Sequence, residues 1–352
     1  MTAEIPLAEV QPRDMHANVS VAIEPAAIQC IVVPLDGSPL AEGALPVAIA
    51  LAKASGATVR AVHIFVPLAK GTVVPGLFEY AANVEAQLAK EARAYVRDVR
   101  RRFQMLEGAQ EIVRVDLSRA LPIKSPFGES ARIVTALERY ARKHSADLIV
   151  MTSHGRGGFS RAWMGNVADA MIRGTGLPVL IVRAEGRSFG PSVVRHIMIA
   201  LDGSALAERV LPVALAIASA MSARITLVRV AIVHWVVARA SPVAHVNSRD
   251  LAEQRREAEA YFANLLARLR APGVTIDAHV VDEPVTMLPE VGPARALLRT
   301  IASLNADMIA IATHGHGGVK RWWLGSVADK IVRGAPVATL VMRGEPRRGR
   351  TS

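Results

Sequence analysis

One segment occurs twice in this chain, and the duplication constrains the fold more than any other feature. Residues 150–183 align with residues 310–343 at a constant offset of 160, and 14 of the 34 aligned positions are identical. Further upstream, IVVPLDGSPLAEGALPVAIALA from Ile31 matches IMIALDGSALAERVLPVALAIA from Ile197. A repeat of this length indicates two copies of one structural unit.

We therefore expect two domains, which also suits a length of 352 residues. The segment between the copies is short and contains Gly, Ser and Pro, so we expect the domains to pack together. The predicted organisation is an N-terminal extension (1–27), a first domain (28–184), a linker (185–193), a second domain (194–344) and a basic disordered tail (345–352).

Apolar runs typical of buried strands alternate in each copy with segments of helical spacing. In the first copy, strands are predicted at 27–35, 58–66, 111–117, 147–152 and 178–182, and helices at 40–55, 80–106, 129–144 and 167–173. In the second copy, strands should begin near His196, Arg224, Val274, Asp307 and Val337, and helices near Leu206, Asp250, Ala294 and Val327.

This alternation predicts an α/β fold, because strands that alternate with helices form a parallel sheet covered on both faces. Right-handed crossovers then favour a doubly wound topology. We expect two tandem domains, each with a doubly wound five-stranded parallel sheet. Ligands of such sheets bind beyond the carboxyl ends of the strands.

Composition argues against several function classes. The single cysteine, Cys30, cannot form an internal disulfide, which favours a cytoplasmic location. The longest apolar run, 225–238, contains Arg229 and His234 and is too short to span a membrane. The net charge of +11 falls partly in the C-terminal tail and partly on helices of mixed charge without interleaved aromatics. Nucleic-acid binding is therefore not expected.

A glycine-rich turn follows the fourth predicted strand of each copy. Each turn ends in a glycine followed by Asn166 or Ser326 at the start of a helix. A helix N-terminus presents free N–H groups and a positive dipole end, which suits a phosphate. The same residue types are also ordinary choices for a turn and a helix cap, so that alternative stays open. Neither copy contains the phosphate loop or the dinucleotide-binding fingerprint.

The spacing G-x9-G-[ST], after a strand and an S/T-H-G sequence, resembles the nucleotide-binding signature of the universal stress protein family. It occurs as Gly155 with Gly165-Asn166 and again as Gly315 with Gly325-Ser326, and the D-G-S after the first strand also matches. The resemblance covers nearly everything from Cys30 to Arg343. The chain is thus similar to a tandem, two-domain universal stress protein of the ATP-binding type. The resemblance implies two tandem flavodoxin-like domains of the adenine nucleotide alpha hydrolase-like type.

The resemblance implies an ATP site in each half. Asp36 and Asp202 would face adenine or ribose, although a helix-capping role is equally open for them. Ile64 and Val230 would offer backbone groups to adenine. The phosphates would be held by Gly155, Arg156, Gly158, Gly165, Asn166 and Val167 in the first half, and by Gly315, His316, Gly318, Gly325, Ser326 and Val327 in the second. Any Mg²⁺ would be held through the phosphates, and no metal site of protein ligands is expected.

Three positions depart from the full family pattern G-x2-G-x9-G-[ST]. Thr152 and Ala312 replace the first glycine, and Asn166 replaces Ser or Thr. Thr152 adds a branched side chain close to the expected phosphates, and Asn166 is longer than Ser. The resemblance therefore supports the second site better than the first.

A nucleophile with a recurring base is not evident, so we interpret the chain as a binding protein with at most slow ATP hydrolysis. The expected function is a nucleotide-dependent binding or signalling module in stress adaptation. The resemblance also implies an intramolecular pseudo-dimer, paired through the last strands near 178–183 and 337–343, and a further homodimer stays open. The alternatives are a nucleotide-free interaction scaffold and an AMP-transferring enzyme of the wider superfamily.

Overall fold

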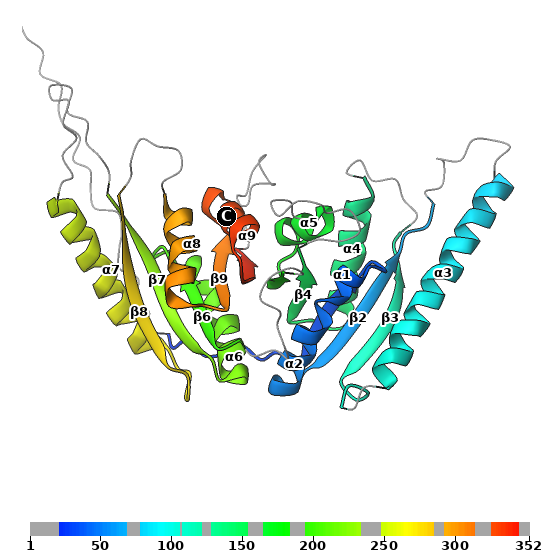
Figure 1. Cartoon of the computed structure of the whole chain (residues 1–352), viewed down its shortest axis with the longest axis horizontal. Helices are drawn as coiled ribbons and strands as arrows, with labels where there is room; N and C mark the ends of the chain where they lie inside the picture. Colours follow the sequence, from blue (N-terminus) through cyan, green and yellow to red (C-terminus); the bar gives the residue numbers. More distant parts are fainter. Residues whose placement is uncertain are drawn as a thin grey trace, which may run out of the picture.

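A computed structural model gives the fold of the chain (Figure 1). It describes residues 21–68, 78–105, 108–121, 128–153, 165–183, 194–233, 248–284, 292–313 and 325–344. The predicted linker 185–193 and the tail 345–352 lie outside these residues. No helix within the described ranges has the length and apolar content needed to cross a bilayer.

The strands form one ten-stranded sheet in the order β3-β2-β1-β4-β5-β10-β9-β6-β7-β8. Within each half every pair is parallel, and the order reverses between the first and fourth strands, which confirms the doubly wound α/β class. The strands are β1 (Cys30–Leu35), β2 (Thr58–Phe65), β3 (Val113–Arg119), β4 (Leu148–Thr152), β5 (Val179–Val182), β6 (His196–Ala200), β7 (Arg224–Val233), β8 (Ile276–Pro284), β9 (Met308–Thr313) and β10 (Ala338–Arg343).

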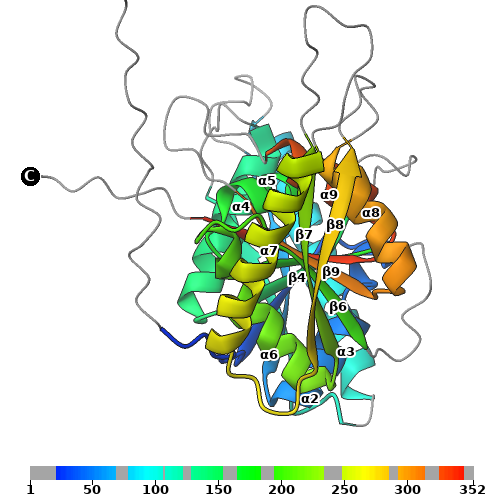
Figure 2. The ribbon, with the colours of Figure 1, turned by 90° about the vertical axis from the view of Figure 1, so that its left-hand side faces the viewer.

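Helices cover both faces of the sheet, and each face buries one apolar core that runs through both halves. One core involves α2 (Leu45–Ser55), α3 (Phe78–Gln104), α6 (Leu211–Met221) and α7 (Ser248–Arg268), together with the short α1 (Pro39–Glu42) and the 3-10 helix η1 (Ala207–Val210). The other involves α4 (Gly128–Lys143), α5 (Asn166–Gly174), α8 (Pro293–Leu304) and α9 (Ser326–Gly334). The side view in Figure 2 shows α7 in front of β7 and β8.

The helix predicted at 40–55 is wrong in one respect, because it is split into α1 and α2. Pro46 lies in the first turn of α2 and has no N–H to continue the helical ladder from α1. The second half shows the same break: α6 begins at Leu211 directly after η1, with Pro212 in its first turn. The other predicted elements occur, with ends displaced by a few residues.

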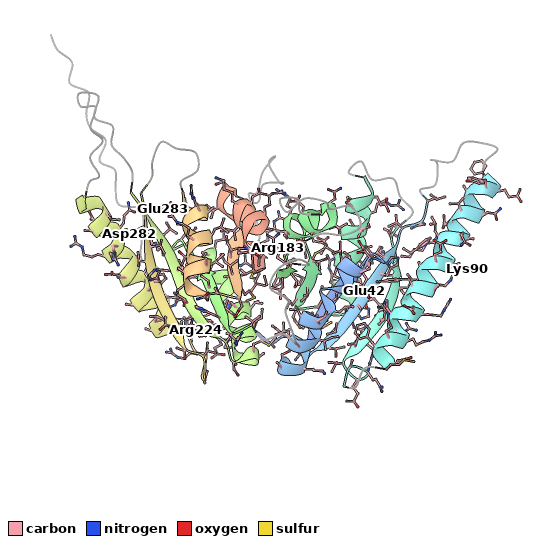
Figure 3. The ribbon with its side chains drawn as sticks, in the orientation of Figure 1. Glu42, Lys90, Arg183, Arg224, Asp282 and Glu283 are labelled. Atoms are coloured by element: carbon pink, nitrogen blue, oxygen red, sulfur yellow. The ribbon has the colours of Figure 1, made fainter. Side chains whose placement is uncertain are left out.

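The halves join through β5 and β10, which pair antiparallel with Leu180 opposite Leu340. An arginine at the end of each of these strands forms a hydrogen bond with the other half. Arg183, near the centre of Figure 3, donates to the carbonyl oxygen of Val332 in α9 at 2.6 Å. Arg343 donates to the carbonyl oxygen of Arg173 in α5. Each half thus supplies a cation to the C-terminal end of the other half's last helix, where the helix dipole favours it.

The described part of the predicted N-terminal extension lies against the second half before the chain enters β1. Ile23 forms a parallel bridge with Leu269, and its amide donates to the carbonyl oxygen of Arg268 at 2.9 Å. The amide of Ala26 then donates to the carbonyl oxygen of Pro212 at 2.8 Å. Residues 21–27 therefore connect the two halves, a role that the sequence did not predict.

Candidate functional site

A cavity of about 830 Å³ opens at the carboxyl ends of β1, β2 and β4 in the first half. This is the end of a doubly wound sheet at which ligands bind, and the volume suits a nucleotide-sized ligand. The cavity brings together every described site residue predicted for this half. They are Asp36, Ile64, Gly165, Asn166 and Val167.

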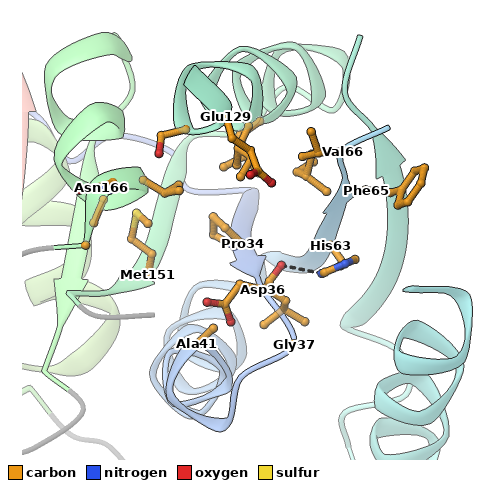
Figure 4. A pocket seen from close by; sticks show the side chains of 18 of the residues that line it. Pro34, Asp36, Gly37, Ala41, His63, Phe65, Val66, Glu129, Met151 and Asn166 are labelled. Carbon is orange, nitrogen blue, oxygen red and sulfur yellow. Dashed lines mark hydrogen bonds between the residues drawn. The ribbon is translucent and has the colours of Figure 1, made fainter. Parts of the chain in front are cut away.

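Asp36 follows β1 directly and lines the cavity, and its carboxylate also stabilises the turn that comes next. Its Oδ1 accepts from the amide of Ser38 at 2.8 Å and from the Ser38 hydroxyl at 2.6 Å. Ser38 in turn caps α1 by accepting from the amide of Ala41 at 3.1 Å. The helix cap is therefore Ser38, with Asp36 bracing it, and the carboxylate of Asp36 still borders the cavity (Figure 4).

The N-terminus of α5 forms the opposite wall. Gly165 has an extended backbone, with φ −60° and ψ 145°, and its amide donates to the carbonyl oxygen of Ser153 at 2.7 Å. The first helical hydrogen bond runs from the amide of Asp169 to the carbonyl oxygen of Gly165 at 2.9 Å. The amides of Asn166, Val167 and Ala168 therefore have no acceptor within the helix. Three donors and the positive helix end thus face one wall of the cavity, the arrangement that favours a phosphate.

Thr152, one of the residues that depart from the family pattern, lines the cavity without filling it. It ends β4 and is 6% exposed. Its methyl carbon Cγ2 would lie 3.8 Å from a Cβ added to Gly43, so the side chain packs toward the segment between α1 and α2. Its bulk is therefore accommodated beside a glycine, and the cavity is present in spite of it.

Three carboxylates line the cavity described for this half. Asp36, Glu91 of α3 and Glu129 in the first turn of α4 all contribute to its wall. An ionised carboxylate only accepts hydrogen bonds. Ribose hydroxyls and an adenine amino group are donors and would suit these acceptors, whereas a phosphate would be repelled from them. The carboxylates therefore approach the cavity from the end of β1 and from helices on both faces of the sheet, and the α5 amides lie at one wall.

His63 and Tyr95 form the wall on the α3 side. The Nδ1 atom of His63 lies 2.9 Å from the carbonyl oxygen of Leu35, as the dashed line in Figure 4 marks, and its ring packs edge-on against Tyr95 at 5.3 Å between centroids. The hydroxyl of Tyr95 donates to Glu42 at 3.0 Å. Burial raises the pKa of Tyr95 above its ordinary range, and Glu42 raises it further, so the phenol remains a donor.

Ile64 contributes to the cavity near the point where β1 ends. The ladder between β1 and β2 closes at the pair Leu35 and His63, one residue before Ile64. Ile64 is buried, with 8% of its surface exposed, and it pairs with Ser118 of β3. Its position is compatible with the backbone contact to adenine that the resemblance implies.

The second half places the corresponding residues at the carboxyl ends of its own strands. Asp202 follows β6 and its Oδ1 accepts from the amide of Ser204 at 2.8 Å, as Asp36 does from Ser38. Val230 lies in β7, and Ser326 and Val327 begin α9. Gly325 differs from Gly165, since its φ of 79° lies in the region that favours glycine.

Six predicted site residues lie outside the described residues, so their placement is untested: Gly155, Arg156, Gly158, Gly315, His316 and Gly318. Within the described ranges, no group of three or more His, Cys, Asp or Glu side chains is placed to hold a metal ion. Sequence reasoning missed several cavity residues, namely His63, Glu91, Tyr95 and Glu129. A repeat search would have indicated one of them, because Tyr95 recurs as Tyr261 at the same offset that relates Asp36 to Asp202.

Comparison with known proteins gives one consistent result. The model of the universal stress protein family matches residues 28–183 and again residues 194–343. A universal stress protein of Mycobacterium tuberculosis is 28% identical over 237 residues, which cover 67% of this chain and 73% of the relative. A second one from the same organism is 25% identical over 323 residues, covering 89% and 94%.

Solved structures show the same fold at lower identity. A universal stress protein from Archaeoglobus fulgidus superposes with a TM-score of 0.59 at 17% identity, covering 89% of this chain and 98% of that one. A universal stress protein from Pseudomonas aeruginosa gives a TM-score of 0.55 at 17% identity, covering 90% and 94%. At this identity the likeness concerns the fold alone.

Proposed function

The chain belongs to the universal stress protein family and carries its domain twice, and on that basis we propose that it binds an adenine nucleotide, ATP, in the cavity of the first half. The observation that carries this proposal is the N-terminus of α5, where the amides of Asn166, Val167 and Ala168 have no acceptor within the helix and border the cavity. Asp36, Glu91 and Glu129 line the same cavity and could accept from the hydroxyl and amino groups of a nucleoside, and the α5 amides could donate to phosphates.

Each group of this chain has a distinct task in the proposed complex. Asp36 accepts from the ribose or the adenine, and the backbone at Ile64 borders the base. The amides of Asn166, Val167 and Ala168 donate to phosphate oxygens. Any Mg²⁺ would be held through the phosphates, because divalent ions of this kind bind phosphate oxygens readily and keep several waters. The corresponding residues of the second half, headed by Asp202 and Ser326, would form a second site.

We further propose that the protein acts in stress adaptation as a nucleotide-dependent binding or signalling module in the cytoplasm, and that it is not an enzyme. A ligand shifts a conformational equilibrium only as far as it binds the two states differently. The pairing of β5 with β10 would then be the intramolecular counterpart of a dimer interface. A nucleotide-free scaffold is the competing proposal.

The nucleotide content of the purified protein tests the proposal. The protein is denatured, and the supernatant is chromatographed for adenine nucleotides. Gly165→Val is the informative variant, because its extended backbone accepts a branched residue while the new side chain would crowd the phosphate wall. We expect about one or two ATP per chain in the native protein and less in Gly165→Val. Absence of bound nucleotide, with no ATP binding at millimolar concentration, would favour the scaffold.

A further inference from the structure

Three residues near the first candidate site recur in the second half, whereas a histidine beside them is replaced by an arginine. At an offset of 166, Glu42, Tyr95 and Arg102 recur as Glu208, Tyr261 and Arg268. Arg102 pairs with Glu42 at 2.8 Å, and Arg268 pairs with Glu208 at 3.0 Å. His63, which lies beside Tyr95 in the cavity wall, is replaced at the same offset by Arg229. The second half therefore has a permanent cation where the first has an imidazole.

Arg229 lies against the turn that begins the second site. A Cβ added to Gly203 would lie 3.0 Å from its Nη1 atom, and its guanidinium carbon lies 5.5 Å from the centroid of the Tyr261 ring. Among the residues that the structure describes, Arg229 takes part in no ion pair. Its donors thus lie beside Gly203, and no described carboxylate forms an ion pair with them.

The position of Arg229 is far from the phosphate wall of the same half. The strand order is β9-β6-β7, so β6 separates the strand of Arg229 from β9, the strand that precedes α9. Two strand spacings amount to roughly 10 Å. An anion bound by Arg229 is therefore a different group from a phosphate at the N-terminus of α9.

We propose that the second half selects an adenine nucleotide that carries an additional phosphate on its ribose, and that Arg229 is the residue that selects it. The inference rests on the proposed nucleotide site. A guanidinium offers two parallel donors to a phosphate, which a single imidazole nitrogen cannot do. In the first half, Nδ1 of His63 already contacts the carbonyl oxygen of Leu35 at 2.9 Å.

Calorimetry on the full chain tests this with two probes of equal phosphate number, ADP and adenosine 3′,5′-bisphosphate. Asn166→Asp silences the first site by placing a carboxylate at its phosphate wall, and Ser326→Asp does the same for the second. In the Asn166→Asp chain we expect the bisphosphate to bind about tenfold more tightly than ADP, a difference of about 1.4 kcal/mol. Arg229→His in that chain should reduce the preference below about threefold.

Two further variants complete the test. His63→Arg in the Ser326→Asp chain should create a preference for the bisphosphate in the first half. Arg256→His, an exposed arginine on the neighbouring α7, is the matched control and should leave the preference unchanged. Thermal unfolding of each variant confirms that it folds.

The outcomes separate the two proposals. Binding of ADP and the bisphosphate with equal affinity in the Asn166→Asp chain would overturn the role of Arg229 and leave nucleotide binding intact. Tighter ADP binding by Arg229→His would also overturn it, because Arg229 would then obstruct the site. Failure of both probes to bind any chain, the unmodified protein included, would overturn the proposed function itself.

Discussion

Arg173 in α5 and Asp329 in α9 lie 3.3 Å apart across the join between the two halves, measured from Nη2 to Oδ1. The reciprocal pair, Arg333 and Asp169, lies at 3.4 Å. Each arginine also pairs with the aspartate of its own helix, at 2.7 Å in α5 and 3.0 Å in α9. Four charges thus connect the two helices whose N-termini border the candidate sites.

The first prediction concerns the ring of charges formed by Asp169, Arg173, Asp329 and Arg333. Asp329→Asn removes a carboxylate that faces two half-buried arginines, so we expect the free energy of unfolding to fall by about 1–2 kcal/mol. Urea denaturation measures the change. Glu259→Gln is the control, because its pair with Arg255 is exposed and i,i+4, and should cost less than ~0.5 kcal/mol. Equal effects of the two variants would contradict a structural role for the ring.

A second prediction concerns Asp147 and its repeat, Asp307. Asp147 accepts from the amides of Gln29 and Cys30 at 2.8 and 3.0 Å. Asp307 accepts from those of Arg195 and His196 at 2.9 and 3.0 Å. Replacing either aspartate with Ala leaves two amides without their acceptor and should cost about 1–3 kcal/mol.

Asn at position 147 or 307 keeps one acceptor oxygen and should cost less than Ala, as chemical denaturation of both pairs of variants will show. If Ala and Asn proved equivalent in both halves, the stabilisation could not be assigned to these hydrogen bonds.

The third prediction is a pH dependence that arises from His196. This side chain is 3% exposed, and its Nδ1 and Nε2 lie 3.0 Å from the carbonyl oxygen of Leu304 and 2.8 Å from the hydroxyl of Thr226. Burial lowers the pKa of His196, and Arg224 lowers it further. The unfolded chain therefore binds more protons than the folded one below the ordinary histidine pKa of about 6.5.

It follows that stability decreases as the pH falls below that value. Denaturation between pH 7.5 and pH 5.5 should show this loss, and His196→Gln should reduce its slope. An unchanged slope in the variant would assign the acid sensitivity to other groups.

A fourth prediction separates the two matched glycines. Gly325 has a φ of 79° and no heavy atom within 4 Å of an added Cβ, so its requirement is conformational. Gly325→Ala should destabilise the protein by about 1–2 kcal/mol. Gly165 has a φ of −60°, so Gly165→Ala should cost little. Thermal unfolding compares them, and an equal loss in both would contradict the assigned backbone conformations.

Much of the fold could be predicted from the sequence, because it follows from period and repetition. The apolar runs that precede Asp36 and Asp202 identify the strands, and their recurrence identifies the duplication. The split between α1 and α2 was missed, since Pro46 lies inside a pattern of helical spacing. The contact of Ile23 with Leu269 could not be predicted either, because it depends on how the two halves pack.

Some residues of the candidate site could likewise be predicted from the sequence, and others could not. Asn166 and Asp36 could be proposed because they lie in or next to recurring motifs. Glu91 and Glu129 are ordinary charged residues of amphipathic helices, and only the folded arrangement brings them to the cavity. The sequence favours the second half because of Thr152 and Asn166, and that preference stays a prediction. Both residues line the cavity of the first half, where Thr152 packs toward Gly43.

The most direct test of nucleotide binding compares Asn166→Asp with Arg97→Gln by calorimetric titration with ATP in the presence of Mg²⁺. Both variants make the net charge more negative by one, and Arg97 is exposed on α3. An Asp in the first turn is favourable to α5 itself, so loss of binding would not reflect loss of the helix. We predict that Asn166→Asp abolishes one binding event or weakens it at least about tenfold, a loss of about 1.4 kcal/mol, and that Arg97→Gln binds like the unmodified chain. Equal ATP binding by all three proteins, or none by any of them, would contradict a phosphate site at the N-terminus of α5.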